Sequence, residues 1–281
     1  MARSSDPGLR RRAVAAVGVA LLLAVAGAAP AAALVLAPHH AVYALTLDGA
    51  RPTGQIEEMN GLIDYEIRGD VCAGYTTVTR QTSESRGGER KVLRQAVSSK
   101  AWEEGEGQSY RFLSTTDDGD GPQEVEARAT RDGPDRLKVA VTRPDERSFI
   151  LKGEILMPTQ HIVHVLKAAA AGTPVLAAKV YDGASDPAKV YETLAVIGRP
   201  RSGGDKLVPE AQRALAGHVA YPVAVSYFEP GALDEAPAYV MNFSLYDNGV
   251  VGDLKIDYGQ FALVGRMTAF EALPGAADCA K

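Results

Sequence analysis

The sequence predicts an all-β protein whose mainly antiparallel strands form a spiral-like or half-closed, open β-barrel with one central α-helix. Apolar and polar residues alternate with a period of two over much of the chain after residue 33, as in strands with one buried face. Glycine, asparagine and aspartate separate these runs, as in tight turns. One alanine-rich segment breaks the alternation and predicts the helix. Strands and helices do not alternate, which argues against a parallel α/β fold.

The first 33 residues have the pattern of a secretory signal peptide. Three arginines at positions 10–12 precede an uncharged stretch, residues 13–29, and small residues follow up to Ala33. A membrane anchor is the alternative, but this alanine-rich stretch is short for a span of ~20 residues. We therefore expect export and cleavage near Ala33, which leaves a single β domain, residues 34–281.

The strands of the first two thirds are predicted by short alternating runs with polar turns between them. Residues 131–134, Arg-Asp-Gly-Pro, predict one such turn, and residues 182–185 predict another. The expected strands lie around residues 42–45, 62–67, 75–82, 91–102, 110–114, 123–130, 137–141, 175–181 and 190–197.

The last third predicts an antiparallel meander. Residues 239–245 and 254–258 both alternate, and Asp-Asn-Gly at 247–249 between them tolerates the positive φ of a tight hairpin. A third strand is expected over residues 261–270, after a short turn.

The helix is expected from Met157 to Gly172. Pro158 suits the first turn of a helix, Thr159 is the expected N-cap, and Gly172 suits the left-handed position after the last turn. Residues 209–216 predict a second, shorter helix. A lone helix of this length in an all-β chain is expected to cover the concave side of a curved sheet.

The chain contains two cysteines, Cys72 and Cys279. In an oxidising, exported compartment an isolated pair favours a disulfide, which would place the C-terminal tail beside residue 72. Two unpaired thiols remain an alternative. A metal or catalytic site is disfavoured, because the pair lacks C-x-x-C spacing and neither cysteine is flanked by His or Cys.

The sequence offers little for catalysis, for cofactors or for metals. It has no G-x-S-x-G, H-E-x-x-H or P-loop motif. His161 and His164 share one face of the expected helix, but a third ligand is missing nearby, which favours packing roles. The acidic run 117–121 has Pro122 where a calcium loop needs an oxygen donor, so a hairpin turn is favoured. Adjacent carboxylates such as Glu103 and Glu104 point to opposite faces of a strand and predict no acid/base pair.

The balance of charges also excludes one class of partner. Lys and Arg total 30 and Asp and Glu total 35, giving a net charge of −5. No basic excess is available to neutralise phosphates, so a nucleic-acid partner is not expected. The acidic balance also disfavours binding to anionic lipid heads, and no stable membrane insertion is expected after cleavage.

Several short stretches together carry a resemblance to a known family. They are Leu-Ala-Pro-His at 36–39 with Tyr43, Gly-Asp-Val-Cys-Ala-Gly-Tyr around Cys72, Met-Pro-Thr-Gln-His at the helix start, residues 182–185, and Cys279. With these residues the chain resembles the EipB-type cell-envelope integrity proteins, which are periplasmic proteins of α-proteobacteria. The resemblance spans essentially the whole chain after residue 33. Met157 departs from the phenylalanine expected there, which affects packing only.

The resemblance implies a spiral-like antiparallel sheet, a disulfide between Cys72 and Cys279, and a periplasmic location. It also implies a non-enzymatic role in envelope integrity, with a periplasmic tetratricopeptide-repeat protein as partner. An alternative, motivated by the half-open barrel, is a carrier that holds a lipid or lipoprotein acyl chain in the concave face. A third hypothesis, a hydrolase of cell-wall glycan, rests on the compartment alone.

Overall fold

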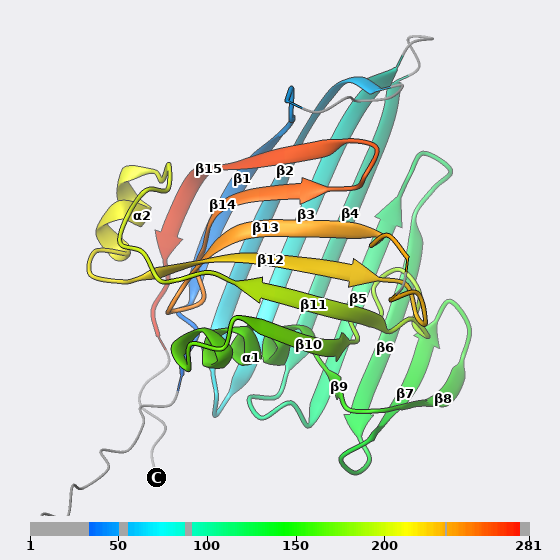
Figure 1. Ribbon diagram of the computed structural model, residues 1–281. Helices are drawn as coiled ribbons and strands as arrows, with labels where there is room; N and C mark the ends of the chain where they lie inside the picture. The colour runs from blue at the N-terminus through cyan, green and yellow to red at the C-terminus, as the bar shows by residue number, and fades with distance from the viewer. Residues whose placement is uncertain (1–33, 51–55, 88–91, 234, 276–281) are drawn as a thin grey trace, which may run out of the picture. The chain divides into compact units, whose positions relative to one another are not determined.

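The computed structural model describes residues 34–50, 56–87, 92–233 and 235–275, so the expected signal peptide and Cys279 lie outside the described residues. The described residues form one continuous sheet and two helices (Figure 1). The elements are β1 (His39–Leu47), β2 (Ile56–Asp70), β3 (Gly74–Gly87), β4 (Val92–Glu103), β5 (Ser109–Asp117), β6 (Gln123–Arg131), β7 (Arg136–Arg143), β8 (Arg147–Lys152), β9 (Ile155–Leu156), α1 (Pro158–Ala170), β10 (Val175–Val180), β11 (Tyr191–Ile197), α2 (Pro209–Ala214), β12 (Ala220–Phe228), β13 (Tyr239–Tyr246), β14 (Val251–Asp257) and β15 (Ala262–Ala272).

The sheet has 15 strands in the order β8-β7-β6-β5-β4-β3-β2-β1-β15-β14-β13-β12-β11-β10-β9. Neighbouring strands pair antiparallel, except for the parallel pair of β9 and β10. The first and last strands, β1 and β15, pair with each other in the middle of this order. Because β8 and β9 stand at its two ends, the barrel stays open along one seam.

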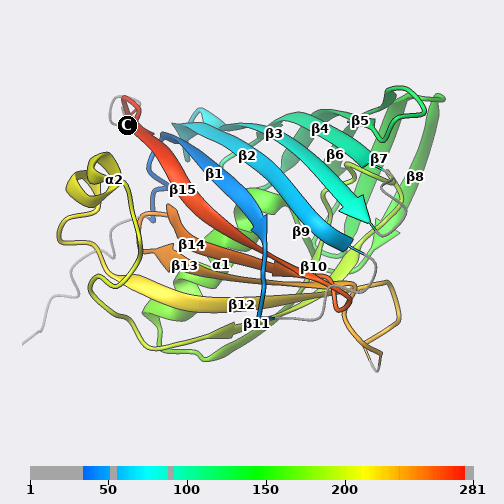
Figure 2. The same ribbon diagram turned by 90° about the horizontal axis from the view of Figure 1, so that it is seen from above.

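Helix α1 lies on the concave side of the curled sheet. Figures 1 and 2 place it between the wall of β2–β8 and the wall of β10–β15. Val165 and Leu166 of α1 belong to one core cluster with Ile67 of β2 and Val225 of β12, so the helix packs on both walls. The predicted half-open barrel with a central helix is confirmed.

The predicted cap of α1 is wrong. The N-cap is Met157, whose backbone is extended and whose side chain makes no capping bond. Glu103 of β4 takes that role, because its carboxylate accepts hydrogen bonds from the backbone N–H groups of Thr159 (2.7 Å) and Gln160 (2.8 Å). The C-terminal prediction is right: Gly172 has a φ of +70° and follows the last turn.

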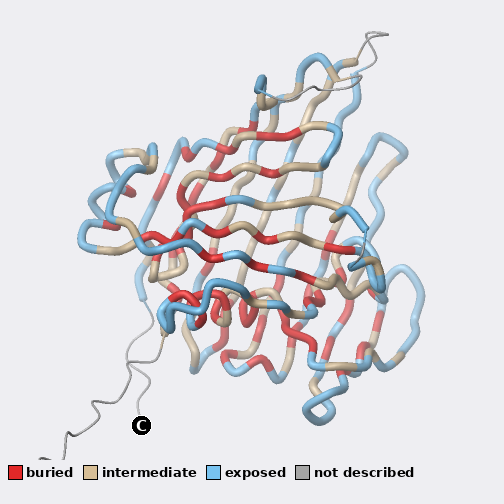
Figure 3. The backbone as a smooth tube through the Cα atoms, viewed as in Figure 1, coloured by how far each residue is buried: buried red, intermediate tan, exposed pale blue. Residues whose placement is uncertain are grey.

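Three strands were not predicted from the sequence: β8, the two-residue β9, and β12. In β12 the period-two pattern is interrupted by Pro222, a residue without an N–H to donate to the sheet. Buried positions alternate with more exposed ones along β11 and β14, as period-two patterning requires, whereas the last four residues of β13 are all buried (Figure 3). The short second helix is present as α2, which packs against β15 with Ala211 and Leu215 buried.

Candidate functional site

The turn between β2 and β3 carries Cys72, and β15 runs toward the same end of the sheet. His39 of β1 lies opposite both Ile67 of β2 and Ala272 of β15. Since β2 and β15 both run antiparallel to β1, both continue beyond these paired residues in the same direction. Cys72 follows Ile67 by five residues, and Cys279 follows Ala272 by seven. This register supports the disulfide, which stays a prediction because Cys279 lies outside the described residues.

Glu103 is a buried carboxylate that the sequence reasoning did not assign to any role. Its side chain is directed inward, the residue is 1% exposed, and burial raises its pKa to about 7 against the opposing effect of the two helix N–H groups. Its neighbour Glu104 lies in the β4–β5 turn, where its carboxylate accepts the N–H groups of Glu106 and Gln108. Ala101 and Glu103 lie on the same, buried face of β4. An acidic residue at a position where the alternation of the strand predicts an apolar one is the signal that could have identified Glu103.

The two histidines of α1 have different surroundings. His161 is buried, with its Nε2 3.4 Å from the hydroxyl of Thr193, and burial lowers its pKa to about 4. His164 is only partly buried. In the part of the chain that the structure describes, no group of three His, Cys, Asp or Glu is placed to hold a metal ion. The acidic run 117–121 forms the turn between β5 and β6, as expected.

Four tyrosines form a row along the inner face of neighbouring strands. This tyrosine row consists of Tyr191 of β11, Tyr227 of β12, Tyr239 of β13 and Tyr258 just after β14. The rings of Tyr227 and Tyr239 stack with centroids 4.5 Å apart, and Tyr258 lies 6.1 Å from Tyr239. All four residues are partly exposed although they share the face of the core residues on their strands.

Asp182 lies beside the tyrosine row, in the segment after β10. Its Oδ1 accepts the N–H of Ala184 at 3.1 Å, and burial raises its pKa although Lys189 opposes that shift. Burial is the main cause of the raised pKa of the Tyr227 and Tyr239 hydroxyls, and the charge of Asp182 adds to it.

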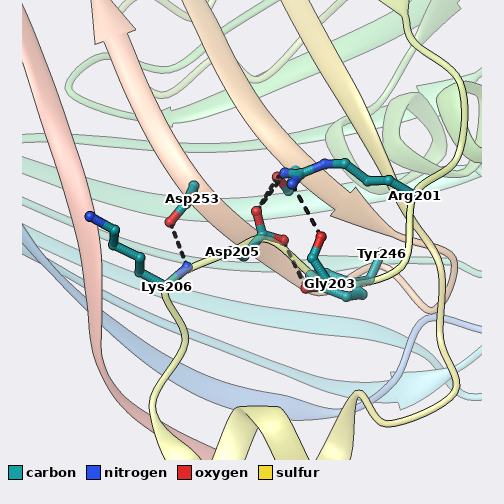
Figure 4. Close-up of polar contacts among 7 residues, drawn as sticks. Arg201, Gly203, Asp205, Lys206, Tyr246 and Asp253 are labelled. Carbon is teal, nitrogen blue, oxygen red and sulfur yellow. Dashed lines mark hydrogen bonds and ion pairs between the residues drawn. The ribbon is translucent and has the colours of Figure 1, made fainter.

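Asp205 stands on the opposite face of the sheet, in the segment before α2 (Figure 4). Its side chain is fully buried. Oδ1 accepts hydrogen bonds from Arg201 Nη2 at 2.6 Å and from Ser244 Oγ at 2.7 Å, and Oδ2 accepts one from the Tyr246 hydroxyl at 2.7 Å. Both oxygens are thus satisfied, and the cluster fastens this segment to β13.

The outer face of β10 and β11 carries exposed apolar side chains. Val175 lies opposite Val196, and Ala177 lies opposite Leu194; we call these four residues the outer patch. Val175 is 49% exposed, Val196 50% and Leu194 36%. Contiguous exposed apolar residues often mark interaction sites.

A curled antiparallel sheet that encloses a helix defines the chain as a β-barrel-like protein. The chain belongs to the EipB-like family, because the sequence model of that family matches residues 30–274. It is 33% identical over 258 residues to the cell envelope integrity protein EipB of Brucella abortus, and the alignment covers 88% of each chain. The resemblance seen in the sequence is confirmed.

A solved structure agrees with this assignment. The fold is similar to the crystal structure of a β-barrel-like protein from Brucella abortus that is described as a domain of unknown function. The TM-score is 0.79 at 28% identity, over 86% of this chain and 100% of that chain. No helix in the described part of this chain is long and apolar enough to cross a membrane.

Proposed function

We propose that the chain is a non-enzymatic periplasmic protein that maintains the integrity of the cell envelope by binding a periplasmic tetratricopeptide-repeat protein. The name of the Brucella abortus relative, cell envelope integrity protein, supports the role. The basic, apolar and small-residue pattern of residues 1–33 supports export with cleavage near Ala33.

The outer patch is the observation that carries the binding mechanism. Its valines, Val175 and Val196, are about half exposed and face each other across β10 and β11. The ion pair of Lys179 and Glu192, 3.4 Å apart, borders the patch along the same two strands. An apolar centre with a charged border is the usual composition of a protein-binding surface. The repeat protein is the partner that the family resemblance implies.

Introducing negative charge into the outer patch tests the binding mechanism. The variant Val175→Asp/Val196→Asp should lose capture of the purified repeat protein and should fail to restore detergent resistance to a deletion strain. Leu62→Asp is the matched control, because Leu62 of β2 is 47% exposed and lies near the middle of the strand order, away from the seam that β9 and β10 border. Full capture by the double variant would contradict the binding surface, and a resistant deletion strain would contradict the envelope role.

The tyrosine row favours a second candidate, a carrier of a lipid or lipoprotein acyl chain. Its rings are directed inward yet remain partly exposed, so they offer aromatic surface that the core does not use. Native mass spectrometry of protein purified from its own host should then show a retained lipid. Protein that is repeatedly free of lipid would argue against the carrier.

A further inference from the structure

The outer face of β4–β8 carries a row of exposed basic side chains, one on each strand. They are Lys100, Arg111, Arg128, Lys138 and Lys152, and we call them the basic band. Along each strand they alternate with residues that are buried or partly buried against the core. The basic band therefore lies on the side of the sheet opposite to the core and to α1.

The strand register brings the five side chains into one diagonal line. Arg111 of β5 and Arg128 of β6 are directly opposite each other. Lys100, Lys138 and Lys152 are each displaced by two residues from the position opposite the neighbouring member, which keeps them on the same face. Because neighbouring strands are about 4.8 Å apart, the line crosses about 19 Å of surface.

No carboxylate of the described residues lies within ion-pair distance of a member of the basic band. The acidic residues nearby belong to other pairs: Glu126 contacts Arg143 at 3.3 Å, and Asp132 contacts Arg136 at 3.2 Å. Like charges directly opposite each other on neighbouring strands destabilise a sheet. The positive charges of the band therefore repel one another, and no described carboxylate neutralises them.

Exposed apolar and aromatic side chains stand between these charges. The ring of Trp102 lies opposite Arg111, whose guanidinium carbon is 4.8 Å from the ring centre. Leu113 and Ile150 lie opposite two lysines of the band and are 36% and 50% exposed. Tryptophan at the depth of the lipid headgroups, together with basic side chains that reach their phosphates, is typical of a protein surface that rests on an anionic bilayer.

The total charge of the chain does not describe this face. The net charge of −5 is summed over the whole sequence and by itself disfavours anionic lipid. Salt screens charges beyond about 8 Å at physiological ionic strength, so a surface in contact with the band is affected mainly by the residues of the band. The fold thus gathers on one face a positive charge that the composition conceals.

We propose that the basic band is a docking surface for a membrane of anionic phospholipid. Headgroup phosphates neutralise Arg111 and Arg128, while Trp102, Leu113 and Ile150 contact the interface between them. The contact is peripheral, because charged residues interrupt the apolar ones across the whole band. The outer patch belongs to other strands, β10 and β11, on the other wall of the barrel, so the two surfaces can be tested separately (Figure 1).

Vesicle binding tests the proposal with a built-in reporter. Trp102 is the one tryptophan of the sequence, so its fluorescence reports directly on the band. Protein purified from its own host should sediment with phosphatidylcholine vesicles that contain about 30% phosphatidylglycerol, and its emission should shift to shorter wavelength. Vesicles of phosphatidylcholine alone should bind at least about tenfold more weakly, and about 0.5 M salt should abolish binding. Equal binding to both vesicles, or no binding to the anionic ones, would overturn the proposal.

Paired variants separate the basic band from a general effect of charge. Arg111→Gln/Arg128→Gln should weaken binding to the anionic vesicles about ten- to thirtyfold, because each basic residue near such a surface contributes about fivefold. Arg86→Gln/Arg94→Gln removes the same charge from exposed arginines of β3 and β4 that are ion-paired with glutamates, and should weaken binding less than about threefold. Equal losses in the two double variants would contradict the band as the docking surface.

The melting temperature gives a readout that distinguishes docking from a structural role. Arg128→Gln removes the repulsion from Arg111, so it should leave the melting temperature unchanged or raise it while vesicle binding falls. A lowered melting temperature would assign the arginine pair to the fold and contradict the proposal. Binding of soluble polyglutamate without binding to anionic vesicles would assign the band to an acidic macromolecule and would also overturn membrane docking.

Discussion

Asp205 and Asp182 differ in the hydrogen bonds that their carboxylates accept. They lie on opposite faces of the sheet. Around Asp205, Arg201, Ser244 and Tyr246 donate to both oxygens of a fully buried side chain. Around Asp182, the backbone N–H of Ala184 is the one donor found among the described residues. A buried carboxylate with every oxygen paired holds a structure together, whereas one oxygen of Asp182 has no hydrogen-bond donor among the described residues.

The tyrosines of the two regions differ in the same way. The Tyr246 hydroxyl donates to Asp205 at 2.7 Å. Near Asp182, the hydroxyl of Tyr181 is buried without a hydrogen-bond partner among the described residues. The comparison therefore predicts that Asp205 contributes more to stability than Asp182 does.

The largest effect on stability is expected from loss of the predicted disulfide, and the effects in the two regions are compared with it. Reduction of a Cys72–Cys279 disulfide, or Cys279→Ala, should lower the free energy of unfolding by about 3–4 kcal/mol, because the long closed loop restricts the unfolded chain. The melting temperature should drop while far-UV circular dichroism still reports a β-sheet. An unchanged melting temperature in dithiothreitol would contradict the disulfide.

Truncation of Asp205 should come next in size. Asp205→Ala leaves Arg201, Ser244 and Tyr246 without their shared acceptor, so urea unfolding should show a loss of about 2–3 kcal/mol. Glu210→Ala is the control: this exposed carboxylate pairs with Arg213 at 3.1 Å, and its loss should cost less than about 0.5 kcal/mol. Equal losses in the free energy of unfolding would show that the buried Asp205 contributes no more to stability than the exposed Glu210.

Glu103 is intermediate between the two aspartates, because it is buried and its main hydrogen bonds come from the backbone N–H groups of Thr159 and Gln160. Folding raises its pKa from 4.5 to about 7, so the native state binds the proton more tightly than the unfolded state. Its contribution to stability is present below pH 4.5 and is lost as the pH rises through about 7. Glu103→Gln should abolish about 1–2 kcal/mol of this decline.

Urea unfolding over that pH range measures the effect, with Glu104→Gln as the neighbouring control. His161 acts in the opposite sense. Since burial lowers its pKa from 6.5 to about 4, its contribution is present above pH 6.5 and is lost as the pH falls toward 4. A decline that persists unchanged in Glu103→Gln would assign the pH dependence to other groups.

The smallest effect on stability is expected for Asp182→Asn. Because burial raises the pKa of Asp182, its ionised form is disfavoured by folding, and a neutral amide should change the free energy of unfolding by less than about 0.5 kcal/mol. A loss as large as that of Asp205→Ala would show that both regions are structural.

Local patterning predicts most of this fold, and the contacts between distant segments account for what it misses. Alternation and turn residues placed the hairpin of β13 and β14, and Pro158 and Gly172 placed α1. Nothing in the neighbourhood of Thr159 shows that Glu103, 56 residues earlier, caps the helix.

The candidate site was less accessible to sequence reasoning than the fold. Tyr239 and Tyr258 fall on predicted strands, and their parity assigns each to the inner face. That Tyr191 and Tyr227 stand beside them follows only from the strand order and register. Arg201 and Asp205 look like ordinary loop residues until Ser244 and Tyr246 are placed against them.

The pairing of β1 with β15 has a consequence for how the chain acquires its structure. His39 and Ala272 are opposite each other although more than 230 residues separate them. Apart from the parallel pair of β9 and β10, the two arms, β1–β8 and β9–β15, are built of antiparallel strand pairs close in sequence that can form early, but their junction waits for the final strand. During synthesis, one edge of β1 therefore stays without its partner until β15 has emerged, and until then that edge can pair with strands of other chains.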